Sequence, residues 1–319
     1  MSLKSSNYPK VTILLATFNR AHLILETLES IANQTYANFE CLITDDNSTD
    51  DTEVVVSAFI ESDSRFFYFK KPKQYPQGLS ATRNYGLDLA ENLKGIYILF
   101  VDDDDIVGPR NLEVCISVFK DLDLDFIHYK IQPFTGGFKG FKSVELQPEG
   151  ICNIDKTRLI EVLDNKIPLA SCSVMWNKTA LKYERFDEEL PYAEELEFYA
   201  RLIAKGRKGC AISAILYYNR KHLNSNTGAF NSGSPVYLKG LLDAYYKTVD
   251  NLTILNLDDY KLAKFFVWKA AIYNEKSLYK YVLKKMNLNF YNKLRLKSIY
   301  NLKPVISLIL KSKKSSKKC

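Results

Sequence analysis

The segment that decides the fold is Ile96-Tyr97-Ile98-Leu99-Phe100-Val101-Asp102-Asp103-Asp104-Asp105, in which an apolar run leads directly into four aspartates. Short apolar runs of this kind are typical of strands buried on both faces of a parallel sheet. Similar runs recur through the first 130 residues, and they predict strands at Val11–Ala16, Phe39–Thr44, Phe66–Lys70, Ile96–Val101 and Phe126–Lys130. Segments with helical spacing separate them. The sequence therefore predicts an α/β fold with a Rossmann-like, mostly parallel central sheet and helices on both faces.

The four aspartates stand where a parallel sheet places its ligands, beyond the carboxyl end of a strand. Adjacent carboxylates repel one another, and a bound cation relieves that repulsion. Oxygen ligands favour Mg²⁺ or Mn²⁺ over softer metals. The alternative is a solvated acidic turn, or acids attracted to a helix N-terminus. Four consecutive aspartates at the end of a strand favour the metal site over the acidic turn.

A second polar run, Asp45-Asp46-Asn47-Ser48-Thr49-Asp50-Asp51, follows the second predicted strand. One reading is purely structural, because Asx turns and helix caps use these residue types. The other is a nucleotide site, in which one carboxylate accepts the N–H of a uracil ring. Both readings remain open on these residues alone.

Taken together, three stretches resemble the family 2 glycosyltransferases with a GT-A fold, of the bacterial polysaccharide-biosynthesis type. They are Val11–Arg20, Ser30–Tyr36 with Asp45–Asp50, and Phe100–Ile106 with Pro109, the last resembling the DxD metal motif of that family. The match covers about residues 9–223. It implies a metal-dependent transferase that moves a sugar from a nucleotide-diphosphate donor, expected to be a UDP-sugar, to a hydroxyl of a cell-surface polysaccharide or glycolipid.

The resemblance also implies roles for individual residues. The donor would be held by the loop after the first strand, by the second polar run, by a basic helix residue and by one aspartate: Thr17, Phe18, Asn19, Arg20, Asp46, Arg83 and Asp103. Asp102 and Asp104 match the DxD pair and would bind Mn²⁺ or Mg²⁺. Without the resemblance, Arg83 reads as a helix-surface arginine.

The segment Tyr192–Leu202 resembles the family's paired-acid motif at a helix start, whose second acid is the catalytic base. That position is Glu195, where the family commonly has Asp. A carboxylate there would take the proton from the acceptor hydroxyl, and attack opposite the diphosphate would invert the anomeric carbon. The alternative is that Glu194, Glu195 and Glu197 are first-turn acids favoured by the helix dipole.

His222 lies in a polar loop after a predicted strand, next to Arg220 and Lys221. Many GT-A enzymes supply a late metal or diphosphate contact from this place, so we include it as a metal ligand. The alternative is a surface histidine.

Composition is that of a globular protein: 319 residues, 46% hydrophobic and 25% charged. No apolar run approaches the roughly 20 residues of a membrane span. The N-terminal residues lack the pattern of a secretory leader. We therefore expect a cytoplasmic protein, and we interpret the six scattered cysteines as reduced thiols rather than a disulfide framework or zinc site.

Charged residues are distributed unevenly along the chain. Residues 236–319 hold 18 Lys and Arg against 5 Asp and Glu, which leaves the remainder acidic. We predict a GT-A catalytic domain at 1–235, with residues 9–130 binding the nucleotide-sugar and 131–235 the acceptor, followed by a basic helical region at 236–319. Helical spacing runs from Tyr260 to Met286, and the end is a Lys-rich tail.

Val305–Leu310 beside the lysines of the tail predicts weak, peripheral contact with an anionic membrane, at the inner face of the plasma membrane where a lipid-linked glycan acceptor would lie. A solubilising tail is the alternative. No motif for reading nucleic acid accompanies the charge, so we predict no nucleic-acid partner.

Two other functions compete with transfer. A sugar-nucleotide nucleotidyltransferase shares the α/β core but needs a Gly-rich loop after the first strand, and Thr17–Ala21 has no glycine. A catalytically inactive relative that only binds nucleotide or carbohydrate is the other alternative, although Asp102, Asp104 and Glu195 are all present.

Overall fold

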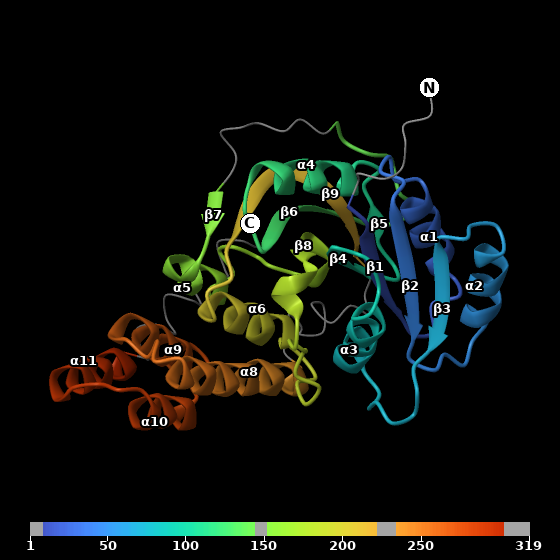
Figure 1. Ribbon diagram of the computed structural model, residues 1–319. Coiled ribbons are helices and arrows are strands. Elements are labelled where there is room, and N and C mark those ends of the chain that lie inside the picture. The colour runs from blue at the N-terminus through green and yellow to red at the C-terminus, as the bar shows by residue number, and fades with distance from the viewer. Residues whose placement is uncertain (1–8, 144–151, 222–233, 303–319) are drawn as a thin grey trace.

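The computed structural model describes residues 9–143, 152–221 and 234–302. Within them the centre is a nine-stranded sheet in the order β3-β2-β1-β4-β8-β6-β9-β5, with β7 paired to β9 (Figure 1). The strands are β1 (Val11–Thr17), β2 (Phe39–Asp45), β3 (Phe66–Lys70), β4 (Tyr97–Asp102), β5 (Ile106–Val107), β6 (Phe126–Phe134), β7 (Cys152–Ile154), β8 (Val174–Asn177) and β9 (Gly209–Arg220).

The first four strands in the sheet order run parallel, as predicted. The register of β1 sets Thr17 opposite Asp45 and Ala16 opposite Asp102, so β1, β2 and β4 end at one edge of the sheet. Beyond β4 the sheet is mixed: β6 and β9 are parallel, whereas β8, β5 and β7 pair antiparallel with their neighbours. The predicted α/β class is confirmed.

Helices cover both faces of the sheet. Every residue of β1 is buried; Leu14 belongs to one apolar core, whereas Ile13 and Leu15 belong to the other. Successive strand residues point to opposite faces, so both faces are covered. The helices before residue 222 are α1 (Ile24–Ala32), α2 (Thr52–Ile60), α3 (Leu79–Ala90), α4 (Asn111–Asp121), α5 (Leu159–Leu163) and α6 (Glu194–Ala204).

The C-terminal extension is helical, as predicted, and lies at the side of the molecule away from β3 (Figure 1). It comprises α8 (Pro235–Ile254), α9 (Tyr260–Ile272), α10 (Lys276–Lys285) and α11 (Phe290–Asn301). The prediction of one helix from Tyr260 to Met286 is wrong. The chain breaks at Asn274, whose φ is 60°, and Glu275 then accepts a hydrogen bond from Ser277 N as the cap of α10. Asparagine tolerates this left-handed conformation, and the apolar spacing on either side conceals the break.

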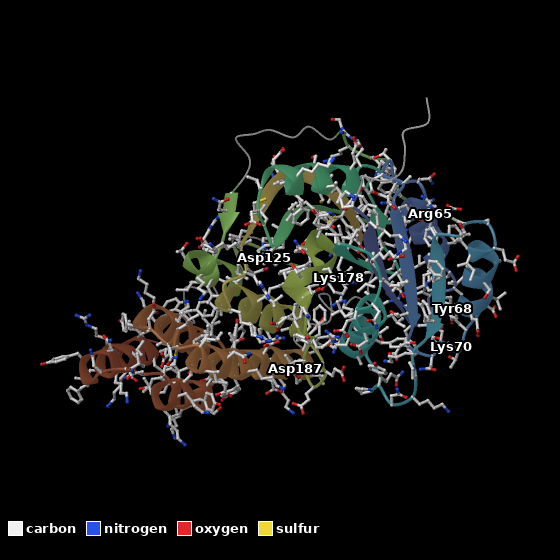
Figure 2. The ribbon with its side chains drawn as sticks, viewed as in Figure 1. Arg65, Tyr68, Lys70, Asp125, Lys178 and Asp187 are labelled. Atoms are coloured by element: carbon white, nitrogen blue, oxygen red, sulfur yellow. The ribbon has the colours of Figure 1, made fainter. Side chains whose placement is uncertain are left out.

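The extension packs against the rest of the chain through α6 and the loop before it. Lys247 of α8 lies 2.6 Å from Asp187, which sits beside that helix in Figure 2, and Asn251 Nδ2 donates to Glu197 at 2.7 Å. The apolar core is continuous across this junction. The division at residue 235 into two domains stays a prediction. Among the residues described, no helix combines the length and apolar character needed to cross a membrane.

Candidate active site

The loop after β1 is hydrogen-bonded to the run of four aspartates, Asp102–Asp105, that begins at the end of β4. Phe18 N donates to Asp103 Oδ2 at 3.2 Å, and Arg20 Nε donates to Asp103 Oδ1 at 3.2 Å. Arg20 also lies 3.6 Å from Asp104 Oδ2. Two segments predicted separately for donor binding are therefore one structure, with Asp103 buried at its centre.

Asn19 joins the loops after β1 and β2. Its φ is 52°, a left-handed conformation that asparagine adopts more readily than most residues. Asn19 N donates to Ser48 Oγ at 2.8 Å, and Asn19 Oδ1 accepts from Thr49 N at 2.7 Å. Part of the polar run after β2 thus orders the predicted donor loop, which supports the structural reading of Ser48 and Thr49.

Asp46 is buried and already has two partners. Lys71 Nζ lies 2.5 Å from Oδ1, and Gly78 N donates to Oδ2 at 2.8 Å. A uracil N–H would therefore meet a carboxylate whose negative charge is already paired with the ammonium group of Lys71. Lys71 was not among the predicted site residues, although it directly follows β3, where the strand-end rule places ligand contacts.

The four aspartates have different surroundings. Asp102 Oδ1 accepts from Arg83 at 2.9 Å. Asp105 is fully buried and accepts from Asn219 Nδ2 and Arg220 N, so it holds the end of β9 in place. Within the described part of the chain, the group of side chains close enough to share a metal ion is Asp102, Asp105 and Cys172, whose ligand atoms lie within 4.8 Å of one another. Asp104 is not in that group.

The electrostatics of the aspartate run fit a divalent cation. Burial raises the pKa of Asp103 to about 7, with a further contribution from the charge of Asp104. Burial and then the charges of Asp102 and Asp104 also hold the pKa of Asp105 well above its usual range. A cation among these carboxylates would offset both the repulsion and the loss of solvent. Carboxylate oxygens suit Mg²⁺ and Mn²⁺, and the buried Cys172 adds one softer atom.

Arg83 connects the aspartate run with the predicted base. The guanidinium is 4% exposed and lies 2.9 Å from Asp102, 3.2 Å from Glu194 and 3.4 Å from Glu195. The guanidinium of Arg83 therefore contacts three acids, one at the end of β4 and two at the start of α6. The sequence analysis named Arg83 as a donor contact, and its partners in the structure are these carboxylates.

The two acids at the start of α6 face this arginine. Ala193, immediately before the helix, has a φ of 62°, which is costly for a residue with a Cβ and recurs at functional sites. Glu195 Oε1 accepts from Ser171 N at 2.7 Å, and its side chain is 28% exposed. Burial, followed by the charge of Glu195, raises the pKa of Glu194 well above its usual range.

A cavity of about 530 Å³ opens beside these acids. One end is formed by Arg83, Asp102, Glu194 and Glu195, and the walls come from α5, α8, α9 and the loop before α6. The wall side chains are mainly apolar or aromatic: Leu163, Pro168, Tyr192, Leu241, Tyr245 and Tyr273. Lys269, paired with Asp164 at 2.9 Å, adds polar groups. The cavity can therefore hold a ligand with both apolar faces and hydroxyls.

The model of the glycosyl transferase family 2 matches residues 12–182, more than half of the chain. The chain belongs to glycosyl transferase family 2. The resemblance stated from the sequence motifs and the prediction of a glycosyltransferase are thereby confirmed.

Glycosyltransferases of several bacteria are similar to the chain, two of them over most of its length. It is 29% identical to the GalNAc(5)-diNAcBac-PP-undecaprenol beta-1,3-glucosyltransferase of Campylobacter jejuni, over 88% of this chain and 89% of that protein. An uncharacterized glycosyltransferase of Rickettsia felis is 26% identical over 89% of this chain, which spans only 44% of that relative's length. A third, WfgD of Escherichia coli, a UDP-Glc:alpha-D-GlcNAc-diphosphoundecaprenol beta-1,3-glucosyltransferase, is 36% identical over 37% of this chain and 44% of its own.

Among solved structures, S. aureus TarS 1-349 in complex with UDP-GlcNAc superposes with a TM-score of 0.65. The alignment covers 92% of this chain and 81% of that one at 18% identity. At this identity the likeness shows the fold alone. It confirms the GT-A fold that the family 2 motifs imply, including the presence of C-terminal helices.

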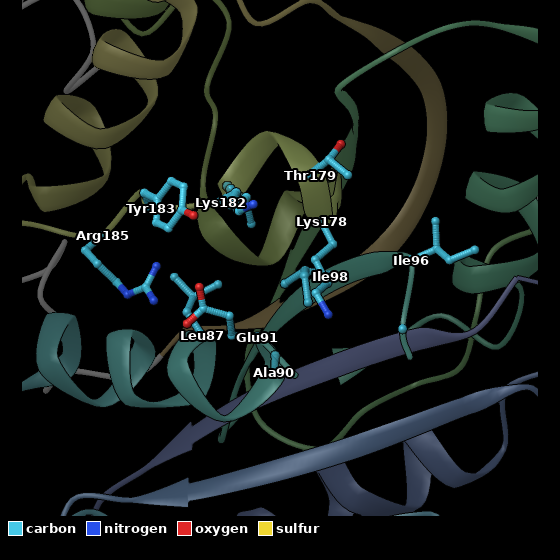
Figure 3. A pocket seen from close by; sticks show the side chains of 12 residues that line it. Leu87, Ala90, Glu91, Ile96, Ile98, Lys178, Thr179, Lys182, Tyr183 and Arg185 are labelled. Atoms are coloured by element: carbon cyan, nitrogen blue, oxygen red, sulfur yellow. The ribbon is translucent and has the colours of Figure 1, made fainter. Parts of the chain in front are cut away.

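A second cavity, of about 360 Å³, lies at the opposite end of β4 (Figure 3). Ile96 and Ile98 line it together with Leu87 of α3, and Lys182, Tyr183 and Arg185 stand near one another at its side in Figure 3. None of the residues predicted from the family 2 motifs lines it. We therefore assign the candidate site to the cavity beside Glu195.

One predicted residue, His222, lies outside the described residues, so its role as a metal ligand stays a prediction. Its neighbour Arg220 is occupied within the fold: the guanidinium donates to Asp104 O at 2.9 Å and to Glu26 at 2.7 Å. The Arg220 side chain is thus held by protein groups.

Glu194 predicts how stability depends on pH. Its pKa is raised in the folded state, so the folded chain binds this proton more tightly than the unfolded chain does. The resulting stabilisation is complete below the unfolded-state pKa of about 4.3 and is lost as the pH rises through the folded-state pKa. In metal-free buffer, urea denaturation from about pH 5 to pH 8 should show a free energy of unfolding that declines, and declines less steeply for Glu194→Gln.

The matched control for this measurement is Glu189→Gln, whose side chain is 84% exposed. Its pH profile should follow that of the unaltered chain. A Glu194→Gln profile parallel to that of the unaltered chain would show that Glu194 titrates normally.

Proposed function

We propose that this chain is an inverting, metal-dependent glycosyltransferase that moves a sugar from a UDP-sugar to a hydroxyl of a lipid-linked or cell-surface glycan. The observation that carries the proposal is the position of Arg83. It brings the DxD aspartate Asp102 and the paired acids Glu194 and Glu195 to one end of one cavity.

The donor half lies at the shared edge of β1, β2 and β4. The loop Thr17–Arg20 and Asp46 would receive the nucleoside, and Asp103 holds that loop to the aspartate run. Asp102 and Asp104 would bind Mn²⁺ or Mg²⁺, with Asp105 and Cys172 next to Asp102. When bound, such an ion neutralises the charge that develops on the departing diphosphate.

The acceptor half is the cavity. The acceptor oxygen attacks the anomeric carbon, the bond from that carbon to the diphosphate oxygen breaks, and the hydroxyl proton passes to Glu195. Attack from the face opposite the diphosphate inverts the configuration. Ser171 N, which donates to Glu195 Oε1, fixes the carboxylate in position and leaves its other oxygen for the acceptor.

The lining of the cavity supports a glycan acceptor. Tyr192 and Tyr273 offer ring surfaces for the apolar faces of a sugar, and Lys269 and Asp164 offer partners for its hydroxyls. Relatives in Campylobacter jejuni and Escherichia coli are named for glycans linked to undecaprenol through a diphosphate. We extend that acceptor class to this chain as part of the proposal.

Calorimetric titration of UDP and of GDP into the protein tests the donor site. We expect UDP to bind with Mn²⁺ present and to bind at least tenfold more weakly with EDTA or after Asp104→Ala, because the phosphates then meet uncompensated carboxylates. Asp123→Ala, a change at an exposed aspartate, is the control and should leave binding unaltered.

The outcome separates the alternatives. Failure of both nucleotides to bind under every metal condition would contradict the donor site. Metal-dependent UDP binding without turnover of any UDP-sugar, in the presence of glycan acceptors or water, would favour an inactive relative. A nucleotidyltransferase would instead consume a nucleoside triphosphate and a sugar phosphate.

A further inference from the structure

The segment that forms α10 and α11 carries only positively charged side chains. Between Lys276 and Leu302 there are seven Lys and Arg and no Asp or Glu. All seven are exposed: Lys276, Lys280, Lys284, Lys285, Lys293, Arg295 and Lys297. Of these, Lys285 is paired with Asp250 of α8 at 3.1 Å. This segment is therefore a cationic surface formed by described residues, whereas the Lys-rich tail lies outside the described residues.

One face of α11 fixes the helix to the rest of the extension. Leu296 is fully buried, and Tyr300 stacks on Tyr279 of α10 with ring centroids 4.3 Å apart. Ile299 packs on the same core. Because positions three and four apart share a face, these residues define which side of α11 points inward.

The opposite face of α11 exposes large apolar side chains. Phe290 is 70% exposed, Tyr291 75% and Leu294 46%, and Leu302 just after the helix is 53% exposed. At 3.6 residues per turn these positions fall on the side away from Leu296. The same geometry sets Lys293 and Lys297 along one border of the apolar stripe and Arg295 along the other.

We propose that this surface, defined by Phe290, Tyr291, Leu294 and Leu302 with the cations of α10 and α11, docks the protein on an anionic lipid bilayer. An apolar stripe with cations along both borders matches the layers of such a surface: rings and leucines enter the boundary of the acyl chains while ammonium groups meet the headgroup phosphates. Each cation near an anionic bilayer adds roughly fivefold to the affinity. Phe290 and Tyr291 could meet either a base or a lipid, but Leu294 and Leu302 give a nucleic-acid base no ring on which to stack, and this favours lipid.

Co-sedimentation of the full chain with vesicles tests the proposal. We expect binding to vesicles of phosphatidylcholine and phosphatidylglycerol, and little binding to phosphatidylcholine alone. Changing Phe290, Tyr291 and Leu294 together to serine should weaken the binding at least tenfold. Changing Lys280, Lys284 and Lys297 together to glutamine should weaken it roughly a hundredfold. The altered side chains are exposed, so circular dichroism and the midpoint of urea unfolding should match those of the unaltered protein.

Matched controls make the result specific. Val54→Ser with Ile254→Ser removes equally exposed apolar side chains elsewhere, and Lys73, Lys94 and Lys139 together changed to glutamine remove the same charge. Both controls should bind vesicles as the unaltered chain does. The proposal is overturned if the α11 variants bind as tightly as the controls, if neutral vesicles bind equally well, or if the same changes abolish binding to RNA or DNA while vesicle binding persists.

Discussion

Glu195→Gln is expected to lower the turnover number by 10²- to 10⁴-fold while UDP binding stays within a few-fold of that of the unaltered chain. The amide keeps the shape of the side chain and can still accept the hydrogen bond from Ser171 N, but it has no basic oxygen to take the acceptor proton. Initial rates of UDP release with a glycan acceptor, combined with calorimetry of UDP, measure the two effects separately.

Glu194→Gln is the most informative comparison for Glu195→Gln. Glu194 shares Arg83 with Glu195, and burial favours its neutral form. Glu194→Gln should therefore retain more activity than Glu195→Gln, and Glu189→Gln should retain all of it. Full activity in Glu195→Gln together with loss in Glu194→Gln would move the base by one residue.

Arg83→Met is expected to reduce the free energy of unfolding by about 3–5 kcal/mol and to abolish transfer. Methionine fills a similar volume but leaves Asp102, Glu194 and Glu195 without the buried cation that now lies within 3.4 Å of each. Because the Arg83 side chain is 4% exposed and lies against three acids, the penalty exceeds that of an ordinary surface ion pair. Urea denaturation in metal-free buffer at neutral pH measures it.

Arg110→Met is the control for the loss of an arginine. Arg110 is exposed and pairs with Glu113 on the surface, so its loss should cost less than about 1 kcal/mol. Arg83→Lys keeps the charge but has no planar fork to reach three acids, and we expect an intermediate loss of stability. An unchanged urea midpoint in Arg83→Met would show that the folded state tolerates Asp102, Glu194 and Glu195 without the charge of Arg83.

Much of the fold could be predicted from the sequence because the buried strands are short apolar runs whose limits are polar. The predicted strand Val11–Ala16 is one residue shorter than β1, and Phe66–Lys70 coincides with β3. The break at Asn274 was missed because it depends on a backbone conformation, whereas apolar spacing continues through it.

Individual residues of the candidate site could be predicted from the sequence, but the contacts between them could not. The strand-end rule and the family 2 motifs predicted Asp102, Asp46 and Glu195 as site residues, and these roles stay predictions. The rule and the motifs could not show that Arg83 joins Asp102 to Glu195, since that contact depends on how α3, β4 and α6 meet in space. The aromatic wall of the cavity was equally hidden, because helical spacing after residue 235 does not show that Tyr245 and Tyr273 line a cavity with Glu195.

The cavity wall has a consequence for how such enzymes diversify. The residues proposed to hold the nucleotide all precede residue 106, whereas Leu241, Tyr245, Lys269 and Tyr273 follow residue 235. Donor choice and acceptor choice would thus be inherited on opposite halves of one gene. A recombination that exchanges the C-terminal helices between two family 2 members could give an old donor a new acceptor in a single event. Conversely, a truncation at residue 235 would remove a wall of the active cavity and expose the apolar core beneath it.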